Sequence, residues 1–279
     1  MSSPGATEPD LLVQSRAALL DALEALEEHR DSVIVVGAQA IYLRTAGAPV
    51  ALAEATKDSD LALDPRLLED DPLLEEAMAA AGFYRNLDSG QPGAWMNPAG
   101  IPVDLMVPER LAGGGGKNSR GARIPPHDRH ATRRARGLEA ALVDNDVMTI
   151  AALDPADSRQ HDVRVAGTAA LVIAKAHKIG ERTASSPHRL NDKDAHDVYR
   201  ILIDTDTDEL ASKFRQLLAH DLCGVAAEEA LVHLRELFAP GPDATGSMMA
   251  GRAEEGVGEP ATVALQTSIL AADLLGALA

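Results

Sequence analysis

The sequence has almost no cysteine, few aromatic residues and no long apolar run. Cys223 is the only cysteine among 279 residues, which excludes an internal disulfide and a zinc site built from cysteines. Aromatic residues make up 3% of the chain, which argues against RNA binding by a broad stacking surface. No segment approaches the ~20 apolar residues that span a bilayer, and no basic and then apolar leader stands at the start. These absences predict a cytoplasmic protein that makes no membrane contact.

The charge of the chain is strongly acidic but unevenly distributed. The formal net charge is -17, with 43 acidic residues against 26 lysines and arginines. The segment 117–136 reverses this balance, because it holds seven basic residues and only one acid. Such a basic segment in an acidic chain predicts contact with phosphate or nucleic acid. A surface loop without such a role is the alternative.

The hydrophobic pattern predicts a mixed α/β domain followed by a helical one. At 279 residues, two domains are expected. Short apolar runs alternate with helical segments up to residue 167 and indicate an α/β (α+β) domain over 1–167, with a mixed sheet. From residue 168 onward the pattern is helical and predicts a second domain over 168–279. Strands are expected at 33–36, 60–63, 101–107, 141–153 and 161–165, and helices at 10–30, 38–45, 65–81, 168–183, 192–204, 208–219, 225–238 and 260–278.

A glycine directly follows the first buried run, and a helical segment directly follows that glycine. In this turn, Val36-Gly37-Ala38, the glycine allows close backbone approach, and free N–H groups at a helix start attract phosphate. Strand–glycine–helix turns occur in many proteins. The turn therefore gains weight only when it is combined with other features.

Two aspartates lie close together at the start of the next predicted strand. The segment 56–64 reads TKDSDLALD. Residues two apart in a strand point to the same side, which would place the carboxylates of Asp58 and Asp60 together. Like charges this close repel unless a cation lies between them, and Mg²⁺ with oxygen ligands suits a phosphate substrate. An acidic strand end without a metal is the alternative.

A third aspartate, Asp104, lies within an otherwise apolar strand that reads IPVDLMV. An unpaired carboxylate is costly to bury, so Asp104 needs a partner. A shared metal ion, a salt bridge or a hydrogen bond to a helix end would each satisfy it.

The second domain carries charged side chains on one face of each of two predicted helices. Lys175, Lys178 and Arg182 share one face, because they lie three and seven residues apart. Asp194 and Asp197 share a face of the next helix. A basic face suits a triphosphate, although basic faces are also common in solvent. Part of the acidic cluster would serve to cap its own helix.

These features, in this order, resemble the DNA polymerase β-like nucleotidyltransferase superfamily. More narrowly, they resemble the AbiEii-type toxins of type IV toxin–antitoxin systems, which include the mycobacterial MenT toxins. The pattern of that family is a glycine turn, a D-x-D strand, a later strand carboxylate, a helical lysine and a K/R-D-x-x-D helix. The segments here read VVGAQAIYL, TKDSDLAL, IPVDLMV, LVIAK and KDAHD, within residues 33–204. The chain departs from the pattern at Ala38, where the superfamily usually has serine or glycine.

The resemblance implies transfer of a nucleoside monophosphate from an NTP, with Mg²⁺ or Mn²⁺ as cofactor. It implies that Asp58, Asp60 and Asp104 hold the metal and act in catalysis. It further implies that Lys175 offsets the charge of the triphosphate and that Asp194 orients Lys175 or the nucleotide. The residues implied to bind the nucleotide are Gly37, Ala38, Thr56, Lys175 and Arg182.

The acceptor implied by the resemblance is the 3′ end of a tRNA, whose backbone the basic segment 117–136 would contact. A protein or a small molecule as acceptor stays open. An antitoxin is implied as a partner, because toxins of this type are encoded beside one.

Two alternative functions use the same residues. One is a catalytically weakened member that binds a nucleotide or a partner, which Ala38 would favour. The other is a metal-dependent phosphohydrolase or nuclease.

Overall fold

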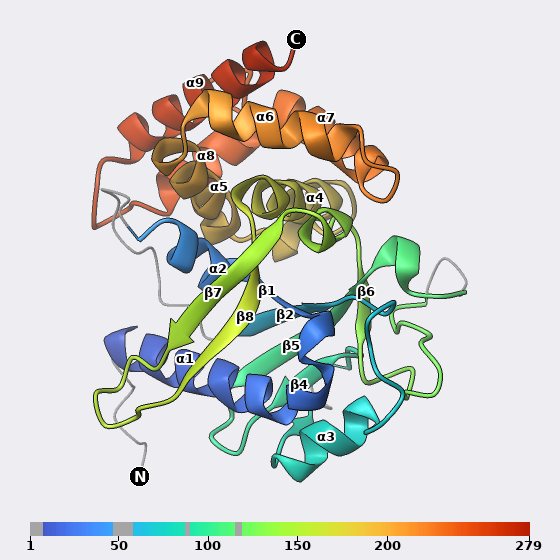
Figure 1. The fold of residues 1–279 in the computed structure, drawn as a ribbon. Coiled ribbons are helices and arrows are strands. Elements are labelled where there is room, and N and C mark those ends of the chain that lie inside the picture. The colour runs from blue at the N-terminus through green and yellow to red at the C-terminus, as the bar shows by residue number, and fades with distance from the viewer. Residues whose placement is uncertain (1–7, 47–57, 87–89, 115–118) are drawn as a thin grey trace. The chain divides into compact units, whose positions relative to one another are not determined.

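The computed structural model describes residues 8–46, 58–86, 90–114 and 119–279 (Figure 1). The chain forms two compact units. The first comprises Met1–Gln39, Glu54–Ala135 and Asp146–Val165, and the second comprises Ala40–Ala53, Arg136–Asn145 and Ala166–Ala279. The longest segment of the second unit begins at Ala166, next to the expected boundary at residue 167. Its two shorter segments, 40–53 and 136–145, interrupt the first unit along the chain, and the sequence pattern does not reveal them.

The first unit is built on an eight-stranded mixed sheet, which confirms the expected α/β (α+β) class. Along the sheet the strands lie in the order β3-β4-β5-β2-β1-β8-β7, and β6 also pairs with β5. β1 runs antiparallel to β2 and parallel to β8, and β2 runs parallel to β5. The strands are β1 (Val33–Val36), β2 (Ser59–Leu63), β3 (Tyr84–Arg85), β4 (Ala94–Met96), β5 (Pro102–Pro108), β6 (Arg133–Ala135), β7 (Asn145–Ala151) and β8 (Gln160–Ala166).

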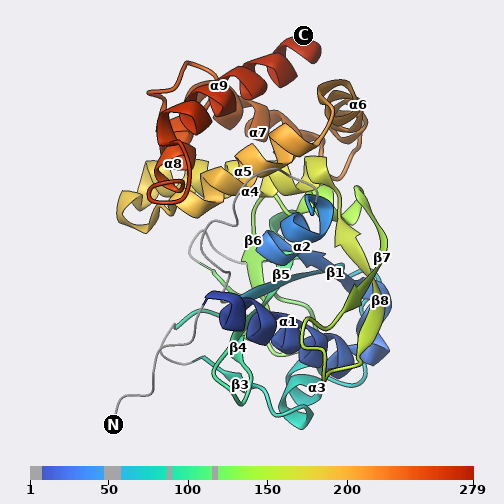
Figure 2. The ribbon, with the colours of Figure 1, turned by 90° about the vertical axis from the view of Figure 1, so that its left-hand side faces the viewer.

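The central strand β1 is buried along its whole length, as an uninterrupted Val-Ile-Val-Val run predicts for a strand covered on both faces. Helix α1 (Glu8–Ala25) packs on one face of the sheet, against β2 and β5 (Figure 2). Leu19 and Leu23 form part of its buried side. The short helix α3 (Leu74–Ala80) packs against α1. The core of this unit therefore fixes the strand ends that carry the aspartates.

Several expected boundaries were wrong, and local hydrogen bonds explain them. The helix expected over 65–81 begins only at Leu74, because the Asp64 carboxylate accepts the Arg66 backbone N–H and forms a turn. The strand expected over 141–153 begins at Asn145, after a 3-10 helix at Glu139–Leu142. The first expected helix ends at Ala25 instead of residue 30, where a 3-10 helix follows. β3, β4 and β6 have two or three residues each, too few to show a period.

The second unit is helical, as expected. α4 is its central helix, since it packs against α5, α6 and α7 (Figure 1). α8 packs against α5 and α9 and lies between residues 238 and 260, where the sequence pattern predicts no helix. α2 (Gly37–Arg44) begins in the first unit and ends in the second. The other helices are α4 (Thr168–Ser185), α5 (Asp192–Asp204), α6 (Thr207–Leu218), α7 (Gly224–Leu237), α8 (Thr245–Arg252) and α9 (Pro260–Ala277).

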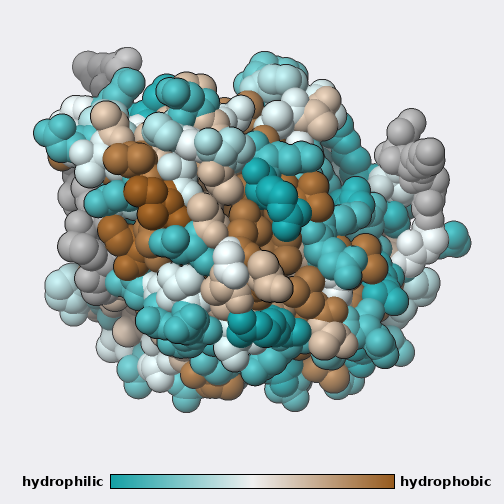
Figure 3. Space-filling model, turned by 90° about the horizontal axis from the view of Figure 1, so that it is seen from above, coloured by the Kyte–Doolittle hydropathy of each residue, from teal (hydrophilic) through white to brown (hydrophobic). Residues whose placement is uncertain are grey.

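Helix α9 is apolar on its covered side and also on part of its open side. Leu265 and Ile269 are 47% and 50% exposed. Figure 3, in which the helical unit faces the viewer, shows apolar side chains gathered in patches on this face. In the described part of the chain, α9 alone has the length and composition of a membrane span, with a mean hydropathy of 1.2. Core helices of globular proteins share that property.

Candidate active site

The glycine turn places the backbone of α2 directly against the carboxylate of Asp60. Gly37 has a φ of +66°, a conformation that residues with a side chain rarely adopt. A Cβ atom at this position would lie 2.1 Å from the Oδ2 atom of Asp60. The sequence predicts close backbone approach at Gly37 and assigns it to phosphate binding. In the structure, the group that approaches the glycine is the aspartate of the D-x-D motif.

Asp60 and Asp104 are direct neighbours across the sheet. They are paired in the register of the parallel strands β2 and β5, so both side chains point to the same face. Asp58 lies just before β2 and is exposed. Ser59, between the two aspartates, is buried, and its hydroxyl donates to the backbone oxygen of Ser15 on α1. The opposite orientation of Ser59 agrees with the predicted alternation of the motif.

An arginine from the basic segment pairs with Asp104. The Nη2 atom of Arg133, on β6, donates to the Oδ2 atom of Asp104 at 2.8 Å, and the two side chains are 27% and 22% exposed. A salt bridge, one of the three partners that the sequence leaves open for Asp104, is therefore present. The sequence does not reveal this contact of Arg133, because β6 is too short to show which of its side chains lies on the same face of the sheet as Asp104.

The chemistry of these carboxylates fits a hard divalent cation, because Mg²⁺ and Mn²⁺ prefer oxygen ligands. Within the described residues, however, no group of three histidine, cysteine, aspartate or glutamate side chains is arranged to hold a metal ion. Metal binding by Asp58, Asp60 and Asp104 stays a prediction.

A buried polar network supports the glycine turn from the other face of the sheet. The guanidinium of Arg16, on α1, donates to the side-chain oxygen of Gln39 at 3.1 Å and to the backbone oxygen of Ala151 at 2.9 Å. The amide of Gln39 donates to the Ser15 hydroxyl at 2.6 Å. This network ties the first turn of α2 to α1 and to β7. The sequence does not reveal this network, because α1 carries other polar and charged residues besides Arg16.

In the second unit, the predicted lysine and aspartates form one ion-pair cluster. The Nζ atom of Lys175, on α4, lies 2.8 Å from Asp194 Oδ1 and 2.7 Å from Asp197 Oδ2, both on α5. Lys178 and Arg182 also contact the Asp194 carboxylate, at 2.8 Å and 3.0 Å. The contact expected between Asp194 and Lys175 is present. A role for either residue in binding a nucleotide stays a prediction.

Burial and charge act in opposite directions on this cluster. Burial alone would lower the pKa of Lys175, but the charges of Asp194 and Asp197 outweigh it and raise that pKa well above its ordinary value. Burial alone would raise the pKa of Asp194, but Lys175 and Lys178 hold it well below its ordinary value. Lys175 and Asp194 are therefore both ionised near neutral pH.

The three cations of this cluster differ in how much of each side chain is exposed to solvent. The Lys175 side chain is 9% exposed, whereas those of Lys178 and Arg182 are 41% and 24% exposed. A ligand on this face would therefore meet Lys178 and Arg182 first. The sequence places Lys178 on the basic face but does not include it among the site residues.

The basic segment divides into arginines that bind the protein itself and arginines that face solvent. Arg133 pairs with Asp104, Arg134 donates to the backbone oxygens of Ala112 and Gly113, and Arg136 pairs with Glu229. Arg120, Arg123 and Arg129 are exposed, and no ion pair joins them to another described residue. Among the arginines of segment 117–136, the expected RNA contact therefore falls to Arg120, Arg123 and Arg129, because the others bind the protein itself.

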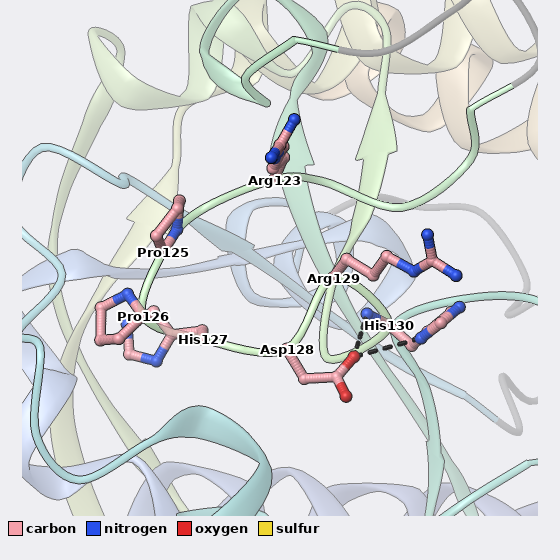
Figure 4. Close-up of a pocket in the computed structure, with 7 residues that line it drawn as sticks. All are labelled: Arg123, Pro125, Pro126, His127, Asp128, Arg129 and His130. Atoms are coloured by element: carbon pink, nitrogen blue, oxygen red, sulfur yellow. Dashed lines mark hydrogen bonds and ion pairs between the residues drawn. The ribbon is translucent and has the colours of Figure 1, made fainter.

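Part of this segment surrounds a shallow hollow of about 410 Å³ (Figure 4). His127 and Asp128 lie in its wall, and the Asp128 carboxylate accepts the backbone N–H of His130 at 2.6 Å. The hollow is lined by Arg123, Pro125, Pro126, His127, Asp128, Arg129 and His130. Two further predicted positions, Thr56 and Lys117, lie outside the described residues.

No known family model matches the sequence, and no curated protein matches it. Among solved structures, the chain is similar to the crystal structure of a "putative nucleotidyltransferase from H. pylori". The similarity covers 98% of this chain and 97% of that chain, at 11% sequence identity and a TM-score of 0.35. A similarity this low supports no statement about function, so any function must be argued from the residues of the site.

Proposed function

We propose that this protein is a Mg²⁺-dependent nucleotidyltransferase that moves a nucleoside monophosphate from an NTP to an acceptor. One observation carries the proposal. The Asp60 carboxylate lies against Gly37 and in register with Asp104, so a phosphate-binding type of turn and two carboxylates share one end of the sheet. Two carboxylates beside a helix start suit a substrate that combines phosphate groups with a divalent cation.

In the proposed reaction, an acceptor hydroxyl oxygen bonds to the α-phosphorus of the NTP. The bond from that phosphorus to the oxygen bridging to the β-phosphate breaks, and pyrophosphate leaves with the electron pair. The Asp104 carboxylate accepts the hydroxyl proton. Backbone N–H groups at Gly37 and Ala38 bind phosphate oxygens. Asp58, Asp60 and Asp104 would hold Mg²⁺, which supplies positive charge that stabilises the phosphate oxygens.

For the second unit taken by itself, we assign phosphate binding to Lys178 and Arg182, the more exposed cations, with Lys175 adding positive charge behind them. Asp194 holds all three cations in one arrangement through its ion pairs. Without that carboxylate, three neighbouring cations would repel one another. This assignment makes Asp194 a positioning residue in the proposed function.

The acceptor that we propose is an RNA, with the 3′ end of a tRNA as the first candidate. The support is the set of exposed arginines at Arg120, Arg123 and Arg129 in a chain of net charge -17. Phosphate contacts act over about ten ångströms at physiological salt, so a local basic surface can work on an acidic protein. We extend the proposal to an AbiEii-like toxin with an antitoxin partner, which growth arrest on induction would test.

The experiment is transfer of label from each of the four α-³²P-labelled NTPs onto total tRNA in the presence of Mg²⁺. Wild type is compared with Asp60→Ala and with Asp208→Ala, an exposed aspartate outside the site. We expect label on RNA that disappears in Asp60→Ala and persists in Asp208→Ala. Label on protein would keep the chemistry and change the acceptor. Equal labelling by all three proteins, or no labelling and no NTP binding, would contradict the proposal.

A second candidate function is favoured by the salt bridge between Arg133 and Asp104 and by Ala38, which is 7% exposed. A protein with these features could bind an NTP without transferring its nucleotide. The same experiment separates the two, because this candidate predicts measurable NTP binding without label on any acceptor.

A further inference from the structure

The loop of residues 123–131, which surrounds the hollow of Figure 4, is irregular but anchored to the first unit at both its bend and its end. The backbone N–H of Leu74, at the start of α3, donates to the Nδ1 atom of His127 at 3.2 Å. The indole N–H of Trp95, on β4, donates to the backbone oxygen of Ala131 at 2.9 Å. The hollow is therefore a preformed feature of this unit, as binding sites for small groups usually are.

Two arginines of this loop carry charges that the protein does not compensate. Arg123 and Arg129 are exposed, and no ion pair or side-chain hydrogen bond joins either of them to another described residue. The one acid of the loop, Asp128, is already paired with Arg85 at 3.2 Å and lies 3.1 Å from His130. The hollow therefore keeps two positive charges available for a ligand with negative groups.

The shape of the hollow indicates an extended ligand. Figure 4 shows Arg123 and Arg129 on the two arms of the loop, with Pro125 and Pro126 at its bend, and the two guanidinium groups do not point at one another. A single small anion would reach one arginine at a time, whereas a ligand with several negative groups reaches both. Between the arginines, the proline rings offer apolar surface, and the volume of about 410 Å³ falls in the range of small-molecule sites.

We propose that the hollow takes one nucleotide of a single-stranded RNA. The phosphates on either side of that nucleotide contact Arg123 and Arg129, and its sugar and base pack on the rings of Pro125 and Pro126. The bases of a single strand can turn out of the stack onto protein side chains, whereas those of a duplex are held inside the helix. This inference rests on the proposed function, because it takes RNA as the acceptor, and it specifies the form of RNA that is bound.

A preference for single strands is a sharp criterion, because charge alone would produce the opposite preference. A duplex has the higher density of phosphates and releases more counter-ions for each contact that a protein makes. A surface that contacts only phosphates should therefore bind a duplex at least as tightly as a single strand. A hollow that accepts a nucleotide should prefer the single strand and should need its bases.

The experiment measures binding of labelled RNA to the full chain by fluorescence anisotropy at a fixed salt concentration. The RNAs are a short single strand, the same strand in a duplex, and a strand of equal length with abasic nucleotides. We expect wild type to bind the single strand about tenfold more tightly than the duplex and about fivefold more tightly than the abasic strand. Arg123→Gln and Arg129→Gln should each weaken single-strand binding about fivefold. Arg235→Gln, which removes an exposed arginine of α7, is the matched control and should bind as wild type does.

Several outcomes would overturn the inference. Equal or tighter binding of the duplex, equal binding of the abasic strand, or no binding of any RNA would each do so. Equal affinities of Arg123→Gln, Arg129→Gln and Arg235→Gln would place the RNA elsewhere. Displacement of the strand by adenosine monophosphate, but not by inorganic phosphate, would identify a free nucleotide as the occupant and would also overturn it.

The outcome for the hollow is separable from the outcome for the proposed function. Single-strand binding that depends on Arg123 and Arg129, without label transfer, would leave this inference standing and contradict the transferase. Label transfer by Arg123→Gln and Arg129→Gln with full RNA affinity would do the reverse. If either variant has a lower Tm than wild type, Arg→Lys at the same position replaces it, because lysine keeps the charge and should retain single-strand binding. Loss of that binding in a folded lysine variant also overturns the inference.

Discussion

At the scale of single residues, two close contacts define the candidate site. Gly37 leaves space for the Asp60 carboxylate, where a side chain would collide with it, and Arg133 donates a hydrogen bond to the Asp104 carboxylate on the neighbouring strand. The glycine is conspicuous in the sequence because it separates a strand from a helix. The arginine is not, because seven basic residues lie within the same segment and nothing in their order distinguishes them.

Replacing Gly37 by alanine should lower label transfer by more than the backbone strain of an alanine at positive φ explains. The new methyl group would meet the Asp60 carboxylate, and a positive φ costs a residue with a side chain about 1–2 kcal/mol. We expect label transfer to fall at least about a hundredfold, in line with misplacement of a catalytic group. Gly100→Ala is the control, because Gly100 has a φ of 78° and no neighbouring atom within 4 Å of its Cβ position. Similar losses of activity in both variants would show that backbone strain alone is responsible.

Neutralising Asp194 should destabilise the second unit. Asp194→Asn leaves the buried Lys175 with Asp197 alone, and breaking a buried ion pair costs about 3–5 kcal/mol. We expect the free energy of unfolding at pH 7 to fall by about 3 kcal/mol, measured in urea. Asp192→Asn is the control, because its pair with Arg252 is exposed and such pairs contribute about 0–1 kcal/mol. Equal effects of the two variants would contradict the inferred cluster.

The same variant should change how stability depends on pH. The pKa of Asp194 is lowered in the folded state, so its contribution is complete above its unfolded pKa of about 4 and is lost as the pH falls through the folded value. We therefore expect the difference in unfolding free energy between wild type and Asp194→Asn to shrink below about pH 4. The raised pKa of Lys175 keeps its own contribution complete up to its unfolded pKa of about 10. A difference that stays constant down to pH 2 would show that the carboxylate charge is not what matters.

At the scale of elements, the hydrophobic period predicted the longer helices and strands and missed the shortest ones. The helices α4, α5, α6, α7 and α9 and the strands β1 and β5 were predicted because each shows a clear period or an apolar run, whereas the eight-residue helix α8 was missed. β6 has three residues, yet it determines which arginines face the carboxylates. The helix expected from residue 65 fails because one carboxylate, that of Asp64, captures a backbone N–H and forms a turn. The spacing of residues in the sequence does not show which side chain will accept a backbone N–H, so such turns were not predicted.

Within the basic segment, only the solvent-facing arginines should contribute to RNA binding. Arg123→Gln/Arg129→Gln removes two exposed charges beside the hollow, and each lost phosphate contact lowers the slope of log affinity against log salt by about 0.7–0.9. We expect weaker tRNA binding with a slope reduced by about 1.5, measured by filter binding at several salt concentrations. Arg235→Gln, an exposed arginine on α7, is the control and should leave both quantities unchanged. An unchanged slope in the double variant would exclude these arginines as phosphate contacts.

At the scale of the whole molecule, the division into units does not follow the chain in two uninterrupted halves. The sequence shows the change to a helical pattern at residue 168, but residues 40–53 and 136–145 also belong to the helical unit. Their contacts explain why. The backbone oxygen and carboxylate of Asp144 accept the N–H groups of Gly167 and Ala170 at the start of α4, and the buried Arg200 donates to the backbone oxygen of Thr45 at 3.0 Å. A pattern read along the chain cannot assign such short passages, because their partners lie far away in sequence.

Because segments 40–53 and 136–145 belong to the helical unit, we expect a fragment of residues 168–279 to fold poorly, although it contains the helices α4 to α9. It lacks Asp144 at the start of α4 and leaves Arg200 without the Thr45 oxygen, and an unsatisfied buried donor costs about 1–3 kcal/mol, or more when it is charged. A fragment of residues 136–279 regains Asp144 and the pair of Arg136 with Glu229. We therefore expect circular dichroism to show a higher and more cooperative thermal transition for 136–279 than for 168–279. Identical transitions would mean that the helices are sufficient by themselves and that the passage at 136–145 contributes nothing to their stability.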